Sequence, residues 1–160
     1  SLLLTLVAFT SLYFYENPAL YAAALLLAGL MDVVDGTMAR LCGKITKLGA
    51  FLDSTLDRVS DFLAILPLTR LNFSGEAVAT LIAISMLVSY ARARGEALGL
   101  RFEGVGLIER AERLLLLISI AVASVFSTHA ALALFYALTA LSAATLAHRV
   151  VYAVVELRKS

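Results

Sequence analysis

The sequence is dominated by long apolar blocks that are separated by short polar breaks. Of its 160 residues, 61% are hydrophobic, and the mean hydropathy is +0.92. A soluble domain is typically about 45–50% apolar, whereas blocks of about 20 apolar residues match the thickness of a bilayer core. We therefore predict an all-α, polytopic membrane protein.

The polar breaks divide the chain into six predicted transmembrane helices. They are expected at residues 1–15, 18–41, 47–69, 76–98, 105–126 and 129–157. Pro67 falls inside the third segment, where it should bend or end the helix. We expect a single domain over residues 1–160. The first block is too short for a full span, so we expect further residues before Ser1.

The basic residues predict the orientation of the chain in the membrane. With six spans, both termini and the second and fourth connections lie on one side. Most basic residues lie on or near that side, whereas Arg70 lies at the other side. The residues on or near the shared side are Arg40, Lys44, Lys47, Arg92, Arg94, Arg101, Arg110, Arg113, Arg158 and Lys159. By the positive-inside rule this side is cytoplasmic, in a multi-pass protein of the cell membrane. The net charge of +1 gives no indication of nucleic-acid binding, and the single Cys42 excludes an internal disulfide.

Four aspartates interrupt the second and third apolar segments in a fixed pattern. The pattern is Asp32-x2-Asp35-Gly36-x2-Ala39-Arg40-x8-Gly49-x3-Asp53-x3-Asp57. An ionised side chain at the bilayer centre costs roughly 2.5–3.5 kcal/mol on insertion scales, so this number of acids needs a physical reason. Spacings of three and four residues put each pair on one helix face. The two helices are joined by a short loop and are expected to be antiparallel neighbours, which gives a cluster of four carboxylates near the cytoplasmic surface.

This cluster has the chemistry of a metal site. Oxygen ligands without His or Cys suit hard cations such as Mg²⁺, Mn²⁺ or Ca²⁺, and four carboxylates can hold two ions that clamp the oxygens of a phosphoryl transfer. Gly36, Ala39 and Gly49 lack bulk, and Arg40 can pair with a phosphate. The structural alternative is that the acids simply pair with Arg40 and Arg58. The number and spacing of the acids favour the metal site.

The pattern D-x2-D-G-x2-A-R-x8-G-x3-D-x3-D resembles, at every fixed position, the motif of the CDP-alcohol phosphotransferase (phosphatidyltransferase) family. The six-span layout is similar too. The resemblance implies an integral membrane enzyme, usually a homodimer, in which an alcohol displaces CMP from a CDP-linked lipid with Mg²⁺ or Mn²⁺ as cofactor. It implies Asp32, Asp35 and Asp53 as metal ligands, and Asp57 as the general base that also touches metal. The implied CDP contacts are Asp32, Gly36, Ala39, Arg40, Gly49 and Asp53. Asp61 lies outside the pattern, and we expect it to pair with a basic residue.

A second charged cluster indicates the acceptor alcohol. The blocks SYARARGEALGL and GLIERAERL, over residues 89–100 and 106–114, resemble those of phosphatidylinositol-phosphate and archaetidylinositol-phosphate synthases. Several arginines at one mouth suit a phosphorylated, anionic acceptor. The resemblance implies inositol 1-phosphate as acceptor, with Arg92, Arg110 and Arg149 as ligands of its phosphate. Other arginines, including Arg113, are expected to be topology anchors or to form salt bridges with Glu96, Glu109 or Glu112.

Two alternatives remain open. The same chemistry can serve glycerol 3-phosphate or another polar alcohol as acceptor. A cation transporter is the alternative from another class, because carboxylates in spans can carry ions. Such transporters often have internal repeats and midplane sites, whereas this sequence has no evident repeat and its acids lie near one face.

Overall fold

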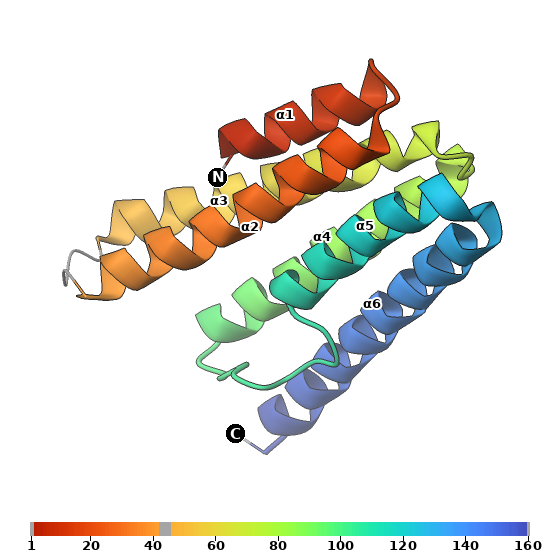
Figure 1. Cartoon of the computed structure of the whole chain (residues 1–160). Coiled ribbons are helices and arrows are strands. Elements are labelled where there is room, and N and C mark those ends of the chain that lie inside the picture. Colours follow the sequence, from red (N-terminus) through yellow and green to blue (C-terminus); the bar gives the residue numbers. More distant parts are fainter. Residues whose placement is uncertain (1, 42–45, 160) are drawn as a thin grey trace.

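The computed structural model describes residues 2–41 and 46–159, with side chains within 2–34 and 46–159 (Figure 1). The helices are α1 (Leu2–Tyr13), α2 (Pro18–Leu41), α3 (Lys47–Ile65), the 3₁₀-helix η1 (Leu66–Arg70), α4 (Gly75–Ala97), α5 (Arg110–Phe126) and α6 (Thr128–Leu157). The described ranges contain no strand. The all-α prediction is therefore confirmed, and each of the six predicted helices has a counterpart. Cys42 and Lys44 fall outside the described residues.

The helices pack as a closed ring around an apolar core. In the order of their contacts the ring runs α1, α2, α5, α6, α4, α3 and back to α1. Completely buried side chains such as Leu25, Leu68, Leu81 and Phe135 come from four different parts of the chain. The outward faces also carry large apolar side chains, such as Phe126, which is 84% exposed. An exterior of this kind is suited to hydrocarbon as solvent.

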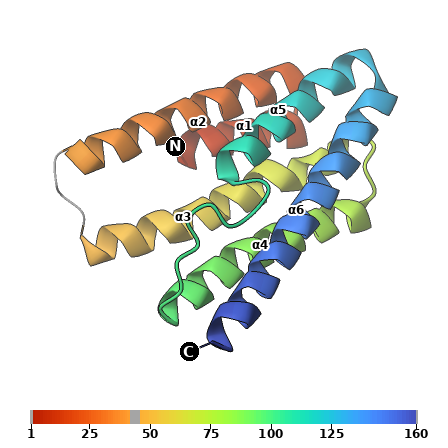
Figure 2. The same ribbon diagram turned by 90° about the horizontal axis from the view of Figure 1, so that it is seen from below.

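The expectation that α2 and α3 are antiparallel neighbours holds in part, because Figures 1 and 2 show the two helices running in opposite directions. They are not among the closely packed helix pairs; instead α1 contacts both, and α2 packs on α5. A hydrogen bond of 2.6 Å from the buried Tyr21 hydroxyl to the Ala64 carbonyl still links them.

Two helix boundaries show how particular residues act. The α-helical part of the third segment ends at Ile65, and Pro67 lies in the tighter η1. The prediction that Pro67 bends or ends the third helix is therefore confirmed. The fifth helix begins at Arg110 rather than at residue 105, which corrects the prediction. Gly104 and Gly106 have φ values of +72° and +140°, which a continuous helix cannot contain. Residues 98–109 therefore form an irregular connection.

The prediction of six membrane spans is supported only in part. Among the described helices, α4 and α6 are long and apolar enough to cross a bilayer, whereas α1 and residues Pro18–Val34 of α2 are shorter apolar segments. The remaining helices fall short because α3 carries charged residues and α5 has 17 residues. Figures 1 and 2 show the C-terminal ends of α2, α4 and α6 and the N-terminal ends of α3 and α5 at one end of the bundle.

Candidate active site

Arg110 contacts three aspartates that come from two helices. Its Nη1 atom is 2.9 Å from Oδ2 of Asp32 and 2.6 Å from Oδ1 of Asp57. Its Nε atom is 3.5 Å from Oδ1 of Asp61. The two motif aspartates come from α2 and α3, and both contact one nitrogen, so their carboxylates face each other across a single cation. The structure thus brings two of the four predicted aspartates together.

Local structure explains how Arg110 reaches this place. Asp57 and Asp61 are one turn apart on α3 and share a face. Arg110 is the first residue of α5, and the Glu112 carboxylate accepts a hydrogen bond of 3.0 Å from the Glu109 backbone N–H. This capping contact fixes where the helix begins. Because α5 packs directly on α2, its first turn projects Arg110 toward Asp32.

A second arginine of α5 makes the most buried ion pair of the site. Nη2 of Arg113 donates to Oδ2 of Asp61 at 2.5 Å, and the two side chains are only 7% and 12% exposed. The expectation that Asp61 pairs with a basic residue is confirmed. Arg113 does form a salt bridge, but its partner is not one of the nearby glutamates. Arg113 was not predicted to belong to the site, although its spacing of three residues from Arg110 puts both on one face of α5.

The remaining motif positions are described only in part. The side chains of Asp35, Gly36, Ala39 and Arg40 lie outside the described residues, so their predicted roles stay predictions. Gly49 and Asp53 are exposed on the first turns of α3. The helix begins there because the Thr46 hydroxyl accepts a hydrogen bond of 3.0 Å from the Gly49 N–H. Asp53 is one turn from Asp57, and its charge acts on that carboxylate.

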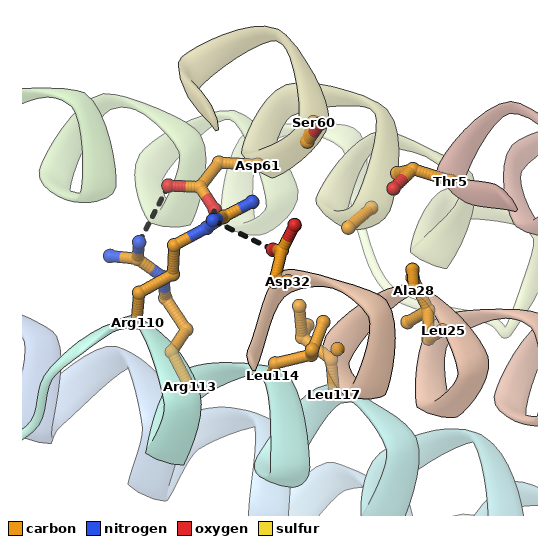
Figure 3. A pocket seen from close by; sticks show the side chains of 12 residues that line it. Thr5, Leu25, Ala28, Asp32, Ser60, Asp61, Arg110, Arg113, Leu114 and Leu117 are labelled. Atoms are coloured by element: carbon orange, nitrogen blue, oxygen red, sulfur yellow. Dashed lines mark hydrogen bonds and ion pairs between the residues drawn. The ribbon is translucent and has the colours of Figure 1, made fainter. Parts of the chain in front are cut away.

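A small pocket, partly open to the outside, adjoins this cluster. Figure 3 shows Asp32 from α2 and Asp61 from α3 pointing toward the arginines of α5, with apolar side chains such as Leu25 and Leu117 along the other side. Thr5 of α1 also lines it. The pocket is therefore charged at one end and apolar at the other.

The carboxylates fit a hard cation in their chemistry. Among the side chains that the structure describes, no three acidic, histidine or cysteine residues form a metal-binding group, and the Asp35 side chain is not in that set. Asp32 and Asp57 nevertheless present oxygens from two helices to one positively charged centre. Oxygen donors of this type are those that Mg²⁺ and Mn²⁺ prefer.

The three predicted phosphate-binding arginines have different surroundings. Arg92 pairs with Glu96, one turn further along α4, at 2.8 Å, and both side chains are about half exposed. Arg110 contacts the motif aspartates. Arg149 is buried on α6, where Nε and Nη1 donate to the carbonyls of Val105 and Val88 at 2.9 and 3.0 Å. Burial of this kind distinguishes Arg149 from an exposed topology anchor.

These features define a class of helical proteins in which acidic side chains from two helices face one cation beside an amphipathic pocket. The family model for CDP-alcohol phosphatidyltransferase matches residues 1–155, and the chain belongs to this family. The resemblance drawn from the aspartate motif is confirmed. The predicted type of enzyme, which transfers a group from a CDP-linked donor to an alcohol, is also confirmed.

Two relatives of this chain are archaetidylinositol phosphate synthases. The chain is 38% identical over 147 residues to archaetidylinositol phosphate synthase of Aeropyrum pernix, covering 92% of this chain and 76% of that protein. It is 44% identical over 108 residues to the same kind of synthase from Methanothermobacter thermautotrophicus, covering 66% of this chain and 55% of the relative. The chain thus spans about three quarters of the length of the first relative and about half of the length of the second.

The fold also matches a solved structure. The crystal structure of Mycobacterium tuberculosis phosphatidylinositol phosphate synthase with CDP-DAG bound has a TM-score of 0.80 and 30% sequence identity, covering 94% of this chain and 82% of that one. A second structure of that synthase, in complex with manganese and citrate, also has a TM-score of 0.80 and 30% identity, with 94% and 78% of the two chains covered. Divalent metal in a relative of this similarity fits the carboxylate chemistry described above.

Proposed function

We propose that the protein transfers a phosphatidyl-type group from a CDP-linked lipid to inositol 1-phosphate and releases CMP. The observation that carries the proposal is the convergence of Asp32 and Asp57, two residues of the family motif, on one cation beside the amphipathic pocket. Support for the acceptor comes from relatives that are named as inositol phosphate synthases. We further propose that residues 1–160 act as one domain.

Asp57 is the proposed general base. Its carboxylate accepts the proton of the acceptor hydroxyl, and the hydroxyl oxygen attacks the phosphorus that carries the lipid alcohol. The bond from that phosphorus to the bridging oxygen breaks, and CMP leaves with that oxygen. Asp57 contacts Arg110 at 2.6 Å, so it has to exchange this partner for the acceptor hydroxyl. The released guanidinium is then close to the place where the acceptor phosphate binds.

Asp32, Asp35, Asp53 and Asp57 are the residues that would hold Mg²⁺ or Mn²⁺, as two ions. When bound, the metal supplies neutralising charge for the transferring phosphoryl oxygens and for CMP. The proposed CDP contacts are Asp32, Gly36, Ala39, Arg40, Gly49 and Asp53. The exposed position of Gly49 and Asp53 on the first turns of α3 supports access by a ligand from outside the bundle.

Arg92, Arg110 and Arg149 are the proposed ligands of the acceptor phosphate. A guanidinium presents a planar fork of donors that matches phosphate oxygens. The half-exposed ion pair between Arg92 and Glu96 supports such a role, because exposed pairs are weak and an incoming phosphate can displace the glutamate. Arg149 already lies beside the connection that precedes Arg110.

We propose that the protein is a multi-pass protein of the cell membrane, with its active site toward the cytoplasm, and that it acts as a homodimer. The apolar exterior and the family support the membrane location. The basic residues near the C-terminal ends of α4 and α6 support the orientation. The lipid tails would enter sideways from the bilayer and the acceptor from the cytoplasm.

The test is release of CMP by purified protein from a CDP-linked lipid across a panel of alcohols, with Mg²⁺ or Mn²⁺. The panel includes inositol 1-phosphate, glycerol 3-phosphate, inositol and choline. We expect inositol 1-phosphate to be the best acceptor, and Asp57→Asn to lose activity. Glu76→Gln makes the same acid-to-amide change on the exposed first turn of α4 and serves as the control. No CMP release by the wild type with any alcohol would refute the function, and full activity of Asp57→Asn would remove that residue from the role of base.

A further inference from the structure

One face of α6 holds the irregular connection between α4 and α5. Thr145, Arg149 and Tyr152 are four and three residues apart, so they lie on the same side of the helix. Each makes a hydrogen bond to the backbone of residues 101–108. Because this segment has no helical or strand hydrogen bonds of its own, its conformation depends on contacts of this kind.

Thr145 makes the contact nearest to the active site. Its buried hydroxyl accepts hydrogen bonds of 3.2 Å from the backbone N–H groups of Leu107 and Ile108, and donates one of 2.8 Å to the Leu141 carbonyl. A hydroxyl has one donor and two acceptor positions, so these three bonds use all of its capacity. The methyl group of Thr145 also lies close to the backbone of Gly106. A Cβ on Gly106 would come within 2.9 Å of Thr145 Cγ2.

The other two residues fix the earlier part of the connection. Arg149 donates to the Val105 carbonyl at 2.9 Å, and the Tyr152 hydroxyl donates to the Arg101 carbonyl at 2.9 Å. The Tyr152 ring also packs edge-on against the buried Phe102, with 5.4 Å between ring centroids. The connection is therefore attached to α6 at three successive points, and Thr145 is the last of them.

The attachment at Thr145 lies two residues before Arg110. Only Glu109, the N-cap of α5, separates the anchored Ile108 from the residue whose guanidinium contacts Asp32 and Asp57. A shift of the backbone at residue 108 therefore moves the first turn of α5, and a misplacement of about 1 Å is enough to impair a catalytic arrangement substantially.

We propose that Thr145 is a positioning residue, which sets the place of Arg110 through its two hydrogen bonds to the Leu107 and Ile108 backbone and so controls binding of the phosphorylated acceptor. This inference rests on the proposed function, in which Arg110 binds the acceptor phosphate. The hydrogen bonds of Thr145 go to Leu107, Ile108 and Leu141, and Thr145 is not one of the residues that line the described pocket.

The test compares Thr145→Val with Thr145→Ser in the full chain. Valine keeps the shape of the side chain but removes both acceptor positions, whereas serine keeps the hydroxyl. Thr139→Val is the matched control, because the Thr139 hydroxyl bonds only within α6, to the Phe135 carbonyl at 2.9 Å. We expect Thr145→Val to raise the KM for the acceptor about tenfold, with the KM for the CDP-linked lipid unchanged and kcat reduced by less. Thr145→Ser and Thr139→Val should remain within about twofold of the wild type.

Limited trypsin digestion gives a readout that does not depend on activity. Arg101 is exposed on the connection, and we expect faster cleavage after it in Thr145→Val than in Thr139→Val. Equal effects on both substrates, failure of serine to rescue, or unchanged cleavage would overturn the proposal. If the wild type uses another alcohol, the proposed acceptor is wrong, and the same kinetic comparison is made with that alcohol. If it releases no CMP at all, the proposed function fails, and unchanged cleavage alone would then refute the anchoring role.

Discussion

The ion pair between Asp61 and Arg113 should be a major source of stability for the active-site end of the bundle. An exposed ion pair contributes about 0–1 kcal/mol. This pair is different, since its atoms are 2.5 Å apart and its side chains are only 7% and 12% exposed. Removal of one partner from a buried pair costs about 3–5 kcal/mol, because the other charge is left without compensation.

We therefore predict that Asp61→Leu lowers the free energy of unfolding by about 3–5 kcal/mol, since it leaves the Arg113 guanidinium buried without its carboxylate. Arg113→Met should cost less, because Nε of Arg110 is still 3.5 Å from the Asp61 carboxylate. The double variant should be more stable than Asp61→Leu alone, because no unpaired charge remains in the interior.

The measurement is chemical denaturation of the four proteins in one detergent, read as a double-mutant cycle. Lys159→Met is the control, because it breaks an exposed pair with Glu156 near the C-terminus and should change stability by less than about 1 kcal/mol. Additive effects of the two substitutions, or a loss below about 1 kcal/mol for Asp61→Leu, would show that the pair is solvated and that the reasoning from burial is wrong.

Three further predictions concern other contacts of the bundle. Arg110→Gln removes the cation between the two motif aspartates, so Mn²⁺ binding without substrates, followed by electron paramagnetic resonance, should become about tenfold tighter; unchanged or weaker binding would contradict this. Gly95→Ala should lower the free energy of unfolding by about 1–3 kcal/mol, because the new Cβ would overlap the ring of Phe102. The measurement is the midpoint of thermal unfolding, which should fall. Gly75→Ala meets no atom within 4 Å and should be neutral, so equal effects of the two would refute the steric argument. Tyr21→Phe should destabilise by about 1 kcal/mol in the same assay, since it removes the hydrogen bond of 2.6 Å to the backbone of α3, and an unchanged midpoint would show that this bond is not needed.

The helices could be predicted from the sequence because their limits depend on local signals. The apolar blocks, the polar breaks and Pro67 gave their number and most of their ends. The start of α5 was placed too early because the block around Val105 is apolar, and only the backbone conformation of Gly104 and Gly106 shows that no helix forms there. The aspartate motif likewise depends on spacing along the chain, which a sequence displays directly.

The pairings of the arginines could not be predicted, because they depend on which helices become neighbours. Spacing relates residues within one helix, but it does not reveal that α5 packs on α2 and so brings Arg110 and Arg113 to the aspartates. Thr145 escaped notice for a related reason. A single threonine in an apolar helix carries no charge or periodic signal, and its hydrogen bonds to residues 107 and 108 become apparent only in the folded structure.

The order of the helices in the ring connects these observations with the proposed chemistry. Asp32 of α2 and Asp57 of α3 lie on either side of one site, where their like charges require compensation by positive charge. Arg110 supplies that charge in the structure described here, at 2.9 and 2.6 Å from Asp32 and Asp57. A divalent ion would provide the same compensation with more charge and would release Arg110 toward an anionic acceptor. Metal binding and acceptor binding should therefore favour each other, and the Mn²⁺ affinity measured with and without inositol 1-phosphate tests this coupling. Affinity that rises with the acceptor in the wild type but not in Arg110→Gln would support the exchange, whereas equal coupling in both proteins would contradict it.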